Sequence, residues 1–280
     1  MTKTQVEVPA EQIQWVDGLP APPDLPIRPF HAATSVAKLI LNKEDTRQVY
    51  EVIHVLAGGA GKRLFQRFVA TPYGRRVVSE PVKLEEILSN RAFLRTLPDG
   101  SVGRAYLDFM EGENLTPDGL LGAAKEAGVD YDAPTQFPEF MRLFLHINIS
   151  HDLWHVLTGY GRDALGELCN LAFTRAQTKN PGIAFINRVG LVAQKLSSPG
   201  VPVLAAFREA ERMGASVDFL LQHDVEALLA QPLADVRKKL GFITPSVYNA
   251  IPADVKAGVL KPAVKKTQAE REGVAAAAHA

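Results

Sequence analysis

The sequence predicts an all-α protein, built as a single domain of many helices. Apolar residues recur at three- and four-residue spacing, first in Ser35–Leu41 and then in Val49–Leu56, which is the repeat of an amphipathic helix. We find no convincing period-two run of β-branched residues and no Asn-Gly hairpin turn, so strands are not expected. The chain has 280 residues, 46% of them hydrophobic, and this length suffices to bury a substantial core.

The helical domain is expected to span 31–250, with different segments on either side. Residues 1–30 are rich in proline, which removes backbone donors and favours an extended N-terminal arm. Lys261, Lys265, Lys266 and a run of four alanines follow residue 250 and indicate a flexible tail or a lone helix over 251–280. Beyond the first two helices, the spacing predicts helices at roughly 62–70, 81–89, 101–112, 117–127, 136–148, 150–158, 163–178, 181–196, 201–213 and 216–239.

Charge and cysteine content exclude several classes of protein. Lysine and arginine together number 31, as do aspartate and glutamate, so no overall positive charge predicts nucleic acid as a partner. The single cysteine, Cys169, excludes an intrachain disulfide and favours a reducing compartment. Met1–Trp15 has no apolar leader, and no apolar run approaches the ~18 residues of a transmembrane helix. We therefore expect a cytoplasmic protein, with peripheral membrane contact left open.

The most informative segment begins at Ser150, which is expected to cap a helix that starts with His151. At ~100° per residue, His151, Asp152 and His155 span an arc of roughly 100° on this helix, so their side chains can converge on one point. Two imidazoles at positions i and i+4 have a spacing that is used to bind zinc. These three residues are therefore candidate ligands of one divalent metal ion.

Glu167 is the fourth candidate ligand. In one unbroken helix it would lie about 24 Å from His151, too far to share an ion. Gly159 and Gly161 favour a helix break between them, and Asp163 can cap a second helix that runs back past the first. The sequence therefore predicts a helical hairpin that carries the metal site.

Neighbouring residues leave alternatives open. The two histidines and Asp152 also fit a hydrogen-bonded core cluster without metal. His146 precedes the predicted helix start, so it is expected to pack or to support the ligands from behind. Arg95 and Arg104 flank the Pro98–Gly100 turn and are candidates to hold a substrate carboxylate or phosphate by bidentate hydrogen bonds. A solvent-facing arginine beside a turn fits that pattern equally well.

The order His-Asp-x-x-His, eleven residues and then Glu resembles the signature of the coenzyme Q biosynthesis protein 4 family. Its surroundings agree, because Arg95-x-Leu-Pro-Asp-Gly-Ser-x-Gly-Arg104 precedes it and Leu240-Gly-Phe-Ile-x-Pro245 closes the region. The resemblance covers residues 31–248 and implies an all-helical fold whose metal site adjoins an apolar groove for a polyprenyl tail. The metal ligands that the resemblance implies are His151, Asp152, His155 and Glu167. The same four residues are the candidate catalytic residues.

The resemblance further implies a function in ubiquinone biosynthesis. The implied reaction is metal-dependent oxidative decarboxylation, which removes the ring carboxylate at C1 of a 4-hydroxy-3-polyprenylbenzoate intermediate and leaves a hydroxyl there. Zinc is the usual label for the ion, whereas oxygen chemistry would favour iron or manganese, because zinc has no redox states. The alternative is a metal-stabilised, lipid-binding scaffold that organises the ubiquinone-biosynthetic enzymes.

The expected partners and location follow from the same resemblance. They are a polyprenylated hydroxybenzoate or related isoprenoid lipid, other ubiquinone-biosynthesis proteins and the membrane surface, with no nucleic acid. A homodimer is left open. The expected location is peripheral, on the inner face of a bacterial inner membrane.

Overall fold

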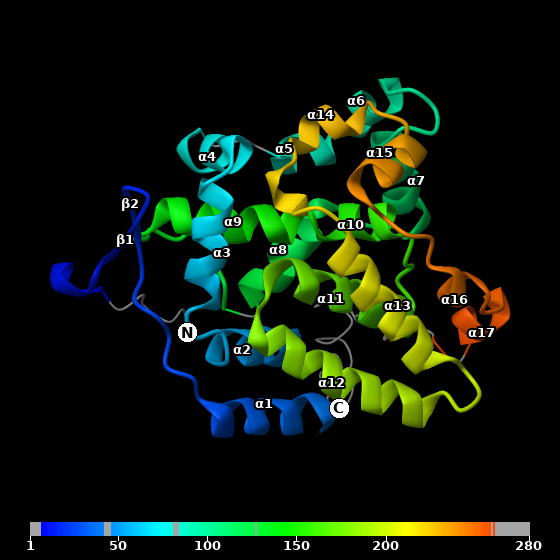
Figure 1. Ribbon diagram of the computed structural model, residues 1–280, viewed down its shortest axis with the longest axis horizontal. Helices are drawn as coiled ribbons and strands as arrows, with labels where there is room; N and C mark the ends of the chain where they lie inside the picture. The colour runs from blue at the N-terminus through cyan, green and yellow to red at the C-terminus, as the bar shows by residue number, and fades with distance from the viewer. Residues whose placement is uncertain (1–6, 42–45, 81–83, 127, 259, 261–280) are drawn as a thin grey trace, which may run out of the picture.

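The computed structural model describes residues 7–41, 46–80, 84–126, 128–258 and 260 (Figure 1). Within these ranges the fold is almost wholly helical, and its strands form one two-stranded sheet. The prediction of an all-α fold is confirmed. No helix among the described residues is both long and apolar enough to cross a bilayer.

The N-terminal arm contains a hairpin that was not expected from the sequence. β1 (Gln14–Val16) pairs antiparallel with β2 (Leu19–Ala21). The turn residues Asp17 and Gly18 both have positive φ, 47° and 79°, and Asp-Gly is a preferred sequence for such a two-residue turn. Ala21 is fully buried in the main core, so the arm is anchored to the domain at this point.

Three helices form one end of the molecule, at the bottom of Figure 1. They are α1 (Pro29–Leu41), α2 (Thr46–Val55) and α12 (Pro181–Ser197). Both α1 and α12 pack on α2, and the three share a small apolar cluster that is separate from the main core.

α11 (Ala164–Thr178) lies at the centre of the fold. It packs along α13 (Val203–Ser216) and along α12. α9 (Pro138–Ile149) and α10 (His151–Thr158) follow one another across the molecule (Figure 1). Because α10 and α11 are consecutive and in contact, the residues of the predicted site lie between well-packed helices.

The remaining helices surround this centre. With the two 3-10 helices they are η1 (Ala10–Gln12), α3 (Ala60–Val69), α4 (Pro72–Ser79), α5 (Leu84–Ser89), α6 (Arg91–Thr96), α7 (Val102–Gly112), α8 (Pro117–Glu126), η2 (Leu220–Gln222), α14 (Val225–Leu229), α15 (Leu233–Leu240), α16 (Ser246–Asn249) and α17 (Ala253–Gly258).

Two parts of the expected helix pattern differ from the structure. The 216–239 segment, expected as one helix, is divided into η2, α14 and α15. Asp224 caps α14 by accepting the N–H of Ala227, and Pro232 precedes α15, so local signals start a new helix twice. α4 and α6 were not expected at all, because they have only 8 and 6 residues and so show about two turns of periodicity at most.

The folded chain also continues past the expected boundary at 250. α17 follows it, and Leu260 is fully buried in the main core. The expected tail beyond it, 261–280, lies outside the described residues.

Candidate metal centre

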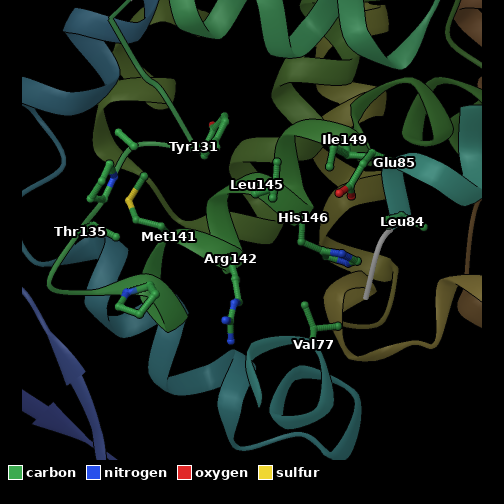
Figure 2. A pocket seen from close by; sticks show the side chains of 13 residues that line it. Val77, Leu84, Glu85, Tyr131, Thr135, Met141, Arg142, Leu145, His146 and Ile149 are labelled. Atoms are coloured by element: carbon green, nitrogen blue, oxygen red, sulfur yellow. The ribbon is translucent and has the colours of Figure 1, made fainter. Parts of the chain in front are cut away.

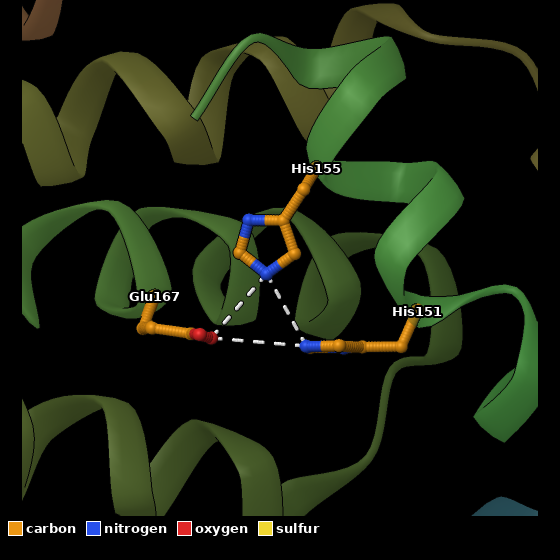
Figure 3. Close-up of side chains that lie close together, drawn as sticks. All are labelled: His151, His155 and Glu167. Atoms are coloured by element: carbon orange, nitrogen blue, oxygen red, sulfur yellow. Dashed lines mark hydrogen bonds and ion pairs between the residues drawn. The ribbon is translucent and has the colours of Figure 1, made fainter. Parts of the chain in front are cut away.

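α10 and α11 are joined by the turn Gly159–Asp163. Gly159 ends α10 in the left-handed conformation, with φ 81°, which glycine adopts without strain. Asp163 caps α11, because its carboxylate accepts the N–H groups of Leu165 and Gly166, each at 3.1 Å. The turn reverses the chain, so Glu167 in the first turn of α11 lies beside α10 (Figure 3).

Ser150 does not act as the side-chain cap that the sequence predicted. Its backbone is helical, its N–H donates to the His146 carbonyl at 3.0 Å, and its carbonyl accepts the N–H of Trp154 at 3.0 Å. α9 therefore runs almost directly into α10, and no free helix start remains for the hydroxyl to satisfy.

His151, His155 and Glu167 form one cluster, which we call the triad (Figure 3). The two histidine Nε2 atoms are 3.2 Å apart. The Oε2 atom of Glu167 lies 3.3 Å from Nε2 of His155 and 3.7 Å from Nε2 of His151. Three atoms that can each donate a lone pair thus face a common point from two helices.

The spacing of the triad fits a tetrahedral metal ion. Bonds of about 2.0–2.1 Å from such an ion place its ligand atoms roughly 3.3 Å apart, and the observed separations are 3.2, 3.3 and 3.7 Å. Two imidazoles and one carboxylate are also a donor set that zinc, iron and manganese accept. The residues present therefore fit the divalent ion that the sequence predicts.

His155 is the rigid member of the triad. Its side chain has no solvent exposure, and its ring stacks on Phe109 of α7 with centroids 5.6 Å apart. Its Nδ1 lies 2.9 Å from the Tyr160 carbonyl, which accepts and therefore fixes the proton on Nδ1. In the neutral ring Nε2 then carries a lone pair toward the triad, as a metal ligand requires.

His151 and Glu167 are more open, with side chains 31% and 38% exposed. Burial acts to raise the pKa of Glu167, but hydrogen bonds and charge from both histidines outweigh it and hold that pKa well below 4.5. Burial acts to lower the pKa of His151, but Glu167 and then Asp152 raise it above 6.5. The carboxylate is therefore ionised, and protons compete with a metal ion for His151 more strongly than they would for a free imidazole.

Asp152, the fourth predicted ligand, is not part of the triad. Its side chain is buried, with 4% exposure. After burial itself, the charge of Asp152 is the largest cause that raises the pKa of Tyr106 in α7. The role of Asp152 as a direct ligand stays a prediction.

Arg95 and Arg104, the predicted substrate-binding residues, are both engaged locally. Arg95 pairs with Glu111. Arg104 donates from Nη1 to the Arg95 carbonyl at 2.8 Å and lies 3.3 Å from Asp99 through Nη2. The two arginines are thus tied to each other and to α7, and their contact with a substrate stays a prediction.

His146 lies apart from the triad, in the wall of a cavity of about 300 Å³ beside α9 (Figure 2). Its ring stacks on Phe68 and meets Tyr73 edge-on. Burial lowers the pKa of His146 to about 4, so the ring is neutral near pH 7. No triad residue lines this cavity, and the expected packing role of His146 fits its surroundings.

The comparisons with known proteins identify the family. The model of the family described as Coenzyme Q (ubiquinone) biosynthesis protein Coq4 matches residues 27–246. The chain belongs to this family. The resemblance drawn from the sequence is confirmed, and the family's role in ubiquinone biosynthesis comes with it.

Relatives of this Coq4-family chain include animal proteins. It is 25% identical over 231 residues to the mitochondrial ubiquinone biosynthesis protein COQ4 homolog of Bos taurus, covering 78% of this chain and 83% of that protein. The Homo sapiens homolog is 26% identical over 209 residues, covering 71% and 73%. A crystal structure of a Nostoc punctiforme protein assigned to ubiquinone biosynthesis shares the fold, with TM-score 0.57, 18% identity and coverage of 77% and 98%.

Several residues that shape this Coq4-family site could not be found from the sequence. Phe109 and Arg162 touch the triad, the latter 3.5 Å from Oε1 of Glu167. The Tyr160 carbonyl orients His155, and a carbonyl has no signature in a sequence. Arg162 is close to Glu167 along the chain, which was the one available signal, whereas Phe109 comes from a distant helix.

Proposed function

We propose that this chain is a metal-dependent enzyme that carries out C1 decarboxylation and hydroxylation of a 4-hydroxy-3-polyprenylbenzoate intermediate in ubiquinone biosynthesis. The observation that carries the proposal is the triad, with three donors at tetrahedral spacing and two of them about one third exposed. Structural metal sites are closed by four protein ligands, whereas catalytic sites keep a position for substrate. The exposure of His151 and Glu167 favours the open kind.

The residues of the triad have distinct roles in this proposal. His155 is held by Tyr160 and Phe109 and keeps its Nε2 aimed at the ion. Glu167 is ionised and supplies a negative charge, and neutral His151 supplies the second nitrogen. A bound divalent ion supplies a positive charge that polarises the ring carboxylate or phenolate. Dioxygen is the co-substrate, so iron or manganese is favoured over zinc.

α7 is the best candidate surface for the apolar part of the substrate. Phe109 stacks on His155, and the same helix lines a second cavity, of about 130 Å³, with Tyr106, Leu107 and Met110. No triad residue lines this cavity, but Phe109 joins the triad to the same helix. An apolar surface suits a prenylated ring, because burial of the prenyl chain contributes binding energy in proportion to its area. Arg104 lies in the first turn of this helix, where its N–H donates to the capping Ser101 side chain, and it is retained as a candidate for the substrate carboxylate.

The alternative is a scaffold, in which the ion stabilises a protein that presents a lipid intermediate to partner enzymes. The names of the relatives support a place among ubiquinone-biosynthesis proteins. In both versions we propose that the protein acts at the inner face of a bacterial inner membrane, as a peripheral protein that contacts other enzymes of the route. Self-association into a homodimer would fit either version.

One experiment separates the two versions. The purified protein is loaded with iron, manganese or zinc, and a carboxyl-labelled 4-hydroxy-3-prenylbenzoate is supplied with dioxygen. Release of labelled carbon dioxide that needs the metal and is lost in His155→Ala supports the enzyme. Full metal occupancy without carbon dioxide release, together with retained binding of the prenylated ligand, supports the scaffold and contradicts the enzyme.

A further inference from the structure

Three residues of the C-terminal part of the chain contact the turn between α10 and α11 or the helix ends beside it. Arg237 of α15 donates to the carbonyls of Val156 and Leu157 at the end of α10, at 2.7 and 2.9 Å. The carbonyl of Leu260 accepts the N–H of Ala164 at the start of α11, at 2.7 Å. Tyr248 of α16 binds the turn itself. The helix ends that carry the triad are thus held by residues from outside the hairpin.

Tyr248 makes the central contact. Its hydroxyl accepts the N–H of Gly161 at 3.0 Å and donates to the Oδ2 atom of Asp163. Its ring packs edge-on against Tyr160, with centroids 5.3 Å apart, and is buried at 3% exposure. One side chain therefore touches three of the five residues of the turn.

The contacts of Tyr248 lead to two of the three triad residues. The Tyr160 carbonyl accepts the Nδ1 proton of His155 at 2.9 Å. The Asp163 carbonyl accepts the N–H of Glu167 at 2.9 Å, while its carboxylate caps the same helix. A shift of the turn would thus rotate the His155 ring and move the start of the helix that carries Glu167.

We propose that Tyr248 is a positioning residue for the metal centre, because its hydroxyl fixes the turn that orients His155 and Glu167. This inference rests on the proposed metal site. Gly161 supports it, since a Cβ at that position would lie 2.7 Å from the Tyr248 hydroxyl oxygen. The contact is so close that a side chain at Gly161 would displace the Tyr248 hydroxyl.

The test compares full-length variants by competition with a chelator for Zn²⁺ and Co²⁺. Tyr248→Phe keeps the ring and removes both hydrogen bonds. We expect its metal affinity to fall about ten-fold or more, as for other partners that orient metal ligands. Ser246→Ala is the matched control, because it removes a partly buried hydrogen bond to Glu209 from the same short helix without touching the turn. This control is expected to keep the wild-type affinity.

A spectroscopic measurement separates positioning from loss of stability. At saturating Co²⁺ the visible spectrum reports the ligand geometry, so Tyr248→Phe is expected to change it and Ser246→Ala to leave it unchanged. Gly161→Ala approaches the same contact from the turn and is expected to match Tyr248→Phe, which keeps the test valid if one variant folds poorly. Wild-type affinity and spectrum in Tyr248→Phe would overturn the inference, provided that His155→Ala abolishes binding. If the wild-type protein binds no metal, or His155→Ala binds normally, the proposed metal site fails instead.

Discussion

Gly166, the residue before Glu167, gives the most direct test of how tightly the turn packs on α11. A Cβ at this position would lie 2.1 Å from the Gly161 carbonyl oxygen and 2.8 Å from the carbonyl carbon. Both are backbone atoms and cannot rotate away as a side chain would. Relief of the clash in Gly166→Ala therefore requires the turn and the helix to separate by roughly 1 Å, in an interior that is close-packed.

Two opposing effects decide the sign for Gly166→Ala. Alanine is more favourable than glycine inside a helix by about 1 kcal/mol. Overpacking against a rigid neighbour costs about 1–3 kcal/mol. Because the neighbour here is backbone, the upper part of that range applies, and we expect a net loss of about 1–2 kcal/mol in the free energy of unfolding.

Urea unfolding followed by circular dichroism measures this difference. The matched control is Gly122→Ala in α8, where an added Cβ would meet nothing within 4 Å. The control is expected to gain up to about 1 kcal/mol, because helix propensity alone acts there. A similar gain in Gly166→Ala would refute the close approach of Gly161 and with it the tight turn. Metal affinity is expected to fall in Gly166→Ala and to stay unchanged in the control.

The remaining predictions concern protonation. Metal affinity is expected to fall as the pH is lowered, starting above pH 6.5, because Glu167 raises the pKa of His151 and protons compete for its Nε2. Glu167→Gln should weaken metal binding but move the onset of this fall to lower pH. Chelator competition across a pH series measures the onset, and the same onset in both proteins would contradict this prediction. His146 has a pKa of about 4 in the fold against about 6.5 unfolded, so the unfolded state binds more protons between these values and stability falls as pH falls through that window. The expected loss in the free energy of unfolding is about 3 kcal/mol, and urea unfolding at both ends of the pH window measures it. His146→Phe should not show this loss. An equal loss in His146→Phe would show that other groups cause the pH dependence.

The sequence was sufficient to predict the triad because its signals are local. His151 and His155 lie one helical turn apart, and the glycines and Asp163 mark the break that brings Glu167 back. Prediction was weaker where the structure of a neighbouring segment overrides a local sequence signal. Ser150 is a good capping residue, but α9 already satisfies its backbone, so the cap is not formed. Asp17-Gly18 was a recognisable turn signal within a proline-rich segment that otherwise favours an extended arm.

The support of the site could not be predicted, because it depends on contacts that are distant in sequence. Phe109 reaches His155 from α7, and Tyr248 reaches the turn from 87 residues beyond Gly161. Both are ordinary core residues by composition, and a buried aromatic residue has no pattern that reveals what it touches. Arg237 likewise resembles any basic residue in the last turn of a helix, yet it holds the end of α10.

Removal of the metal should leave the fold intact, which bears on whether the ion serves structure or chemistry. Small domains that need a structural zinc unfold without it because their apolar core is insufficient. Here the helices that carry the triad are held by an extensive core of their own, in which Leu153, Leu165 and Phe173 are almost fully buried. Prolonged treatment with a chelator should therefore leave the helical circular dichroism unchanged. The free energy of unfolding should drop only by the binding contribution, about 2.7 kcal/mol when the free ion is at ~100 times its Kd. Collapse of the helical signal on metal removal would favour a structural ion. An unchanged signal would favour a catalytic ion, because a site that the fold does not need is free to exchange ligands with a substrate.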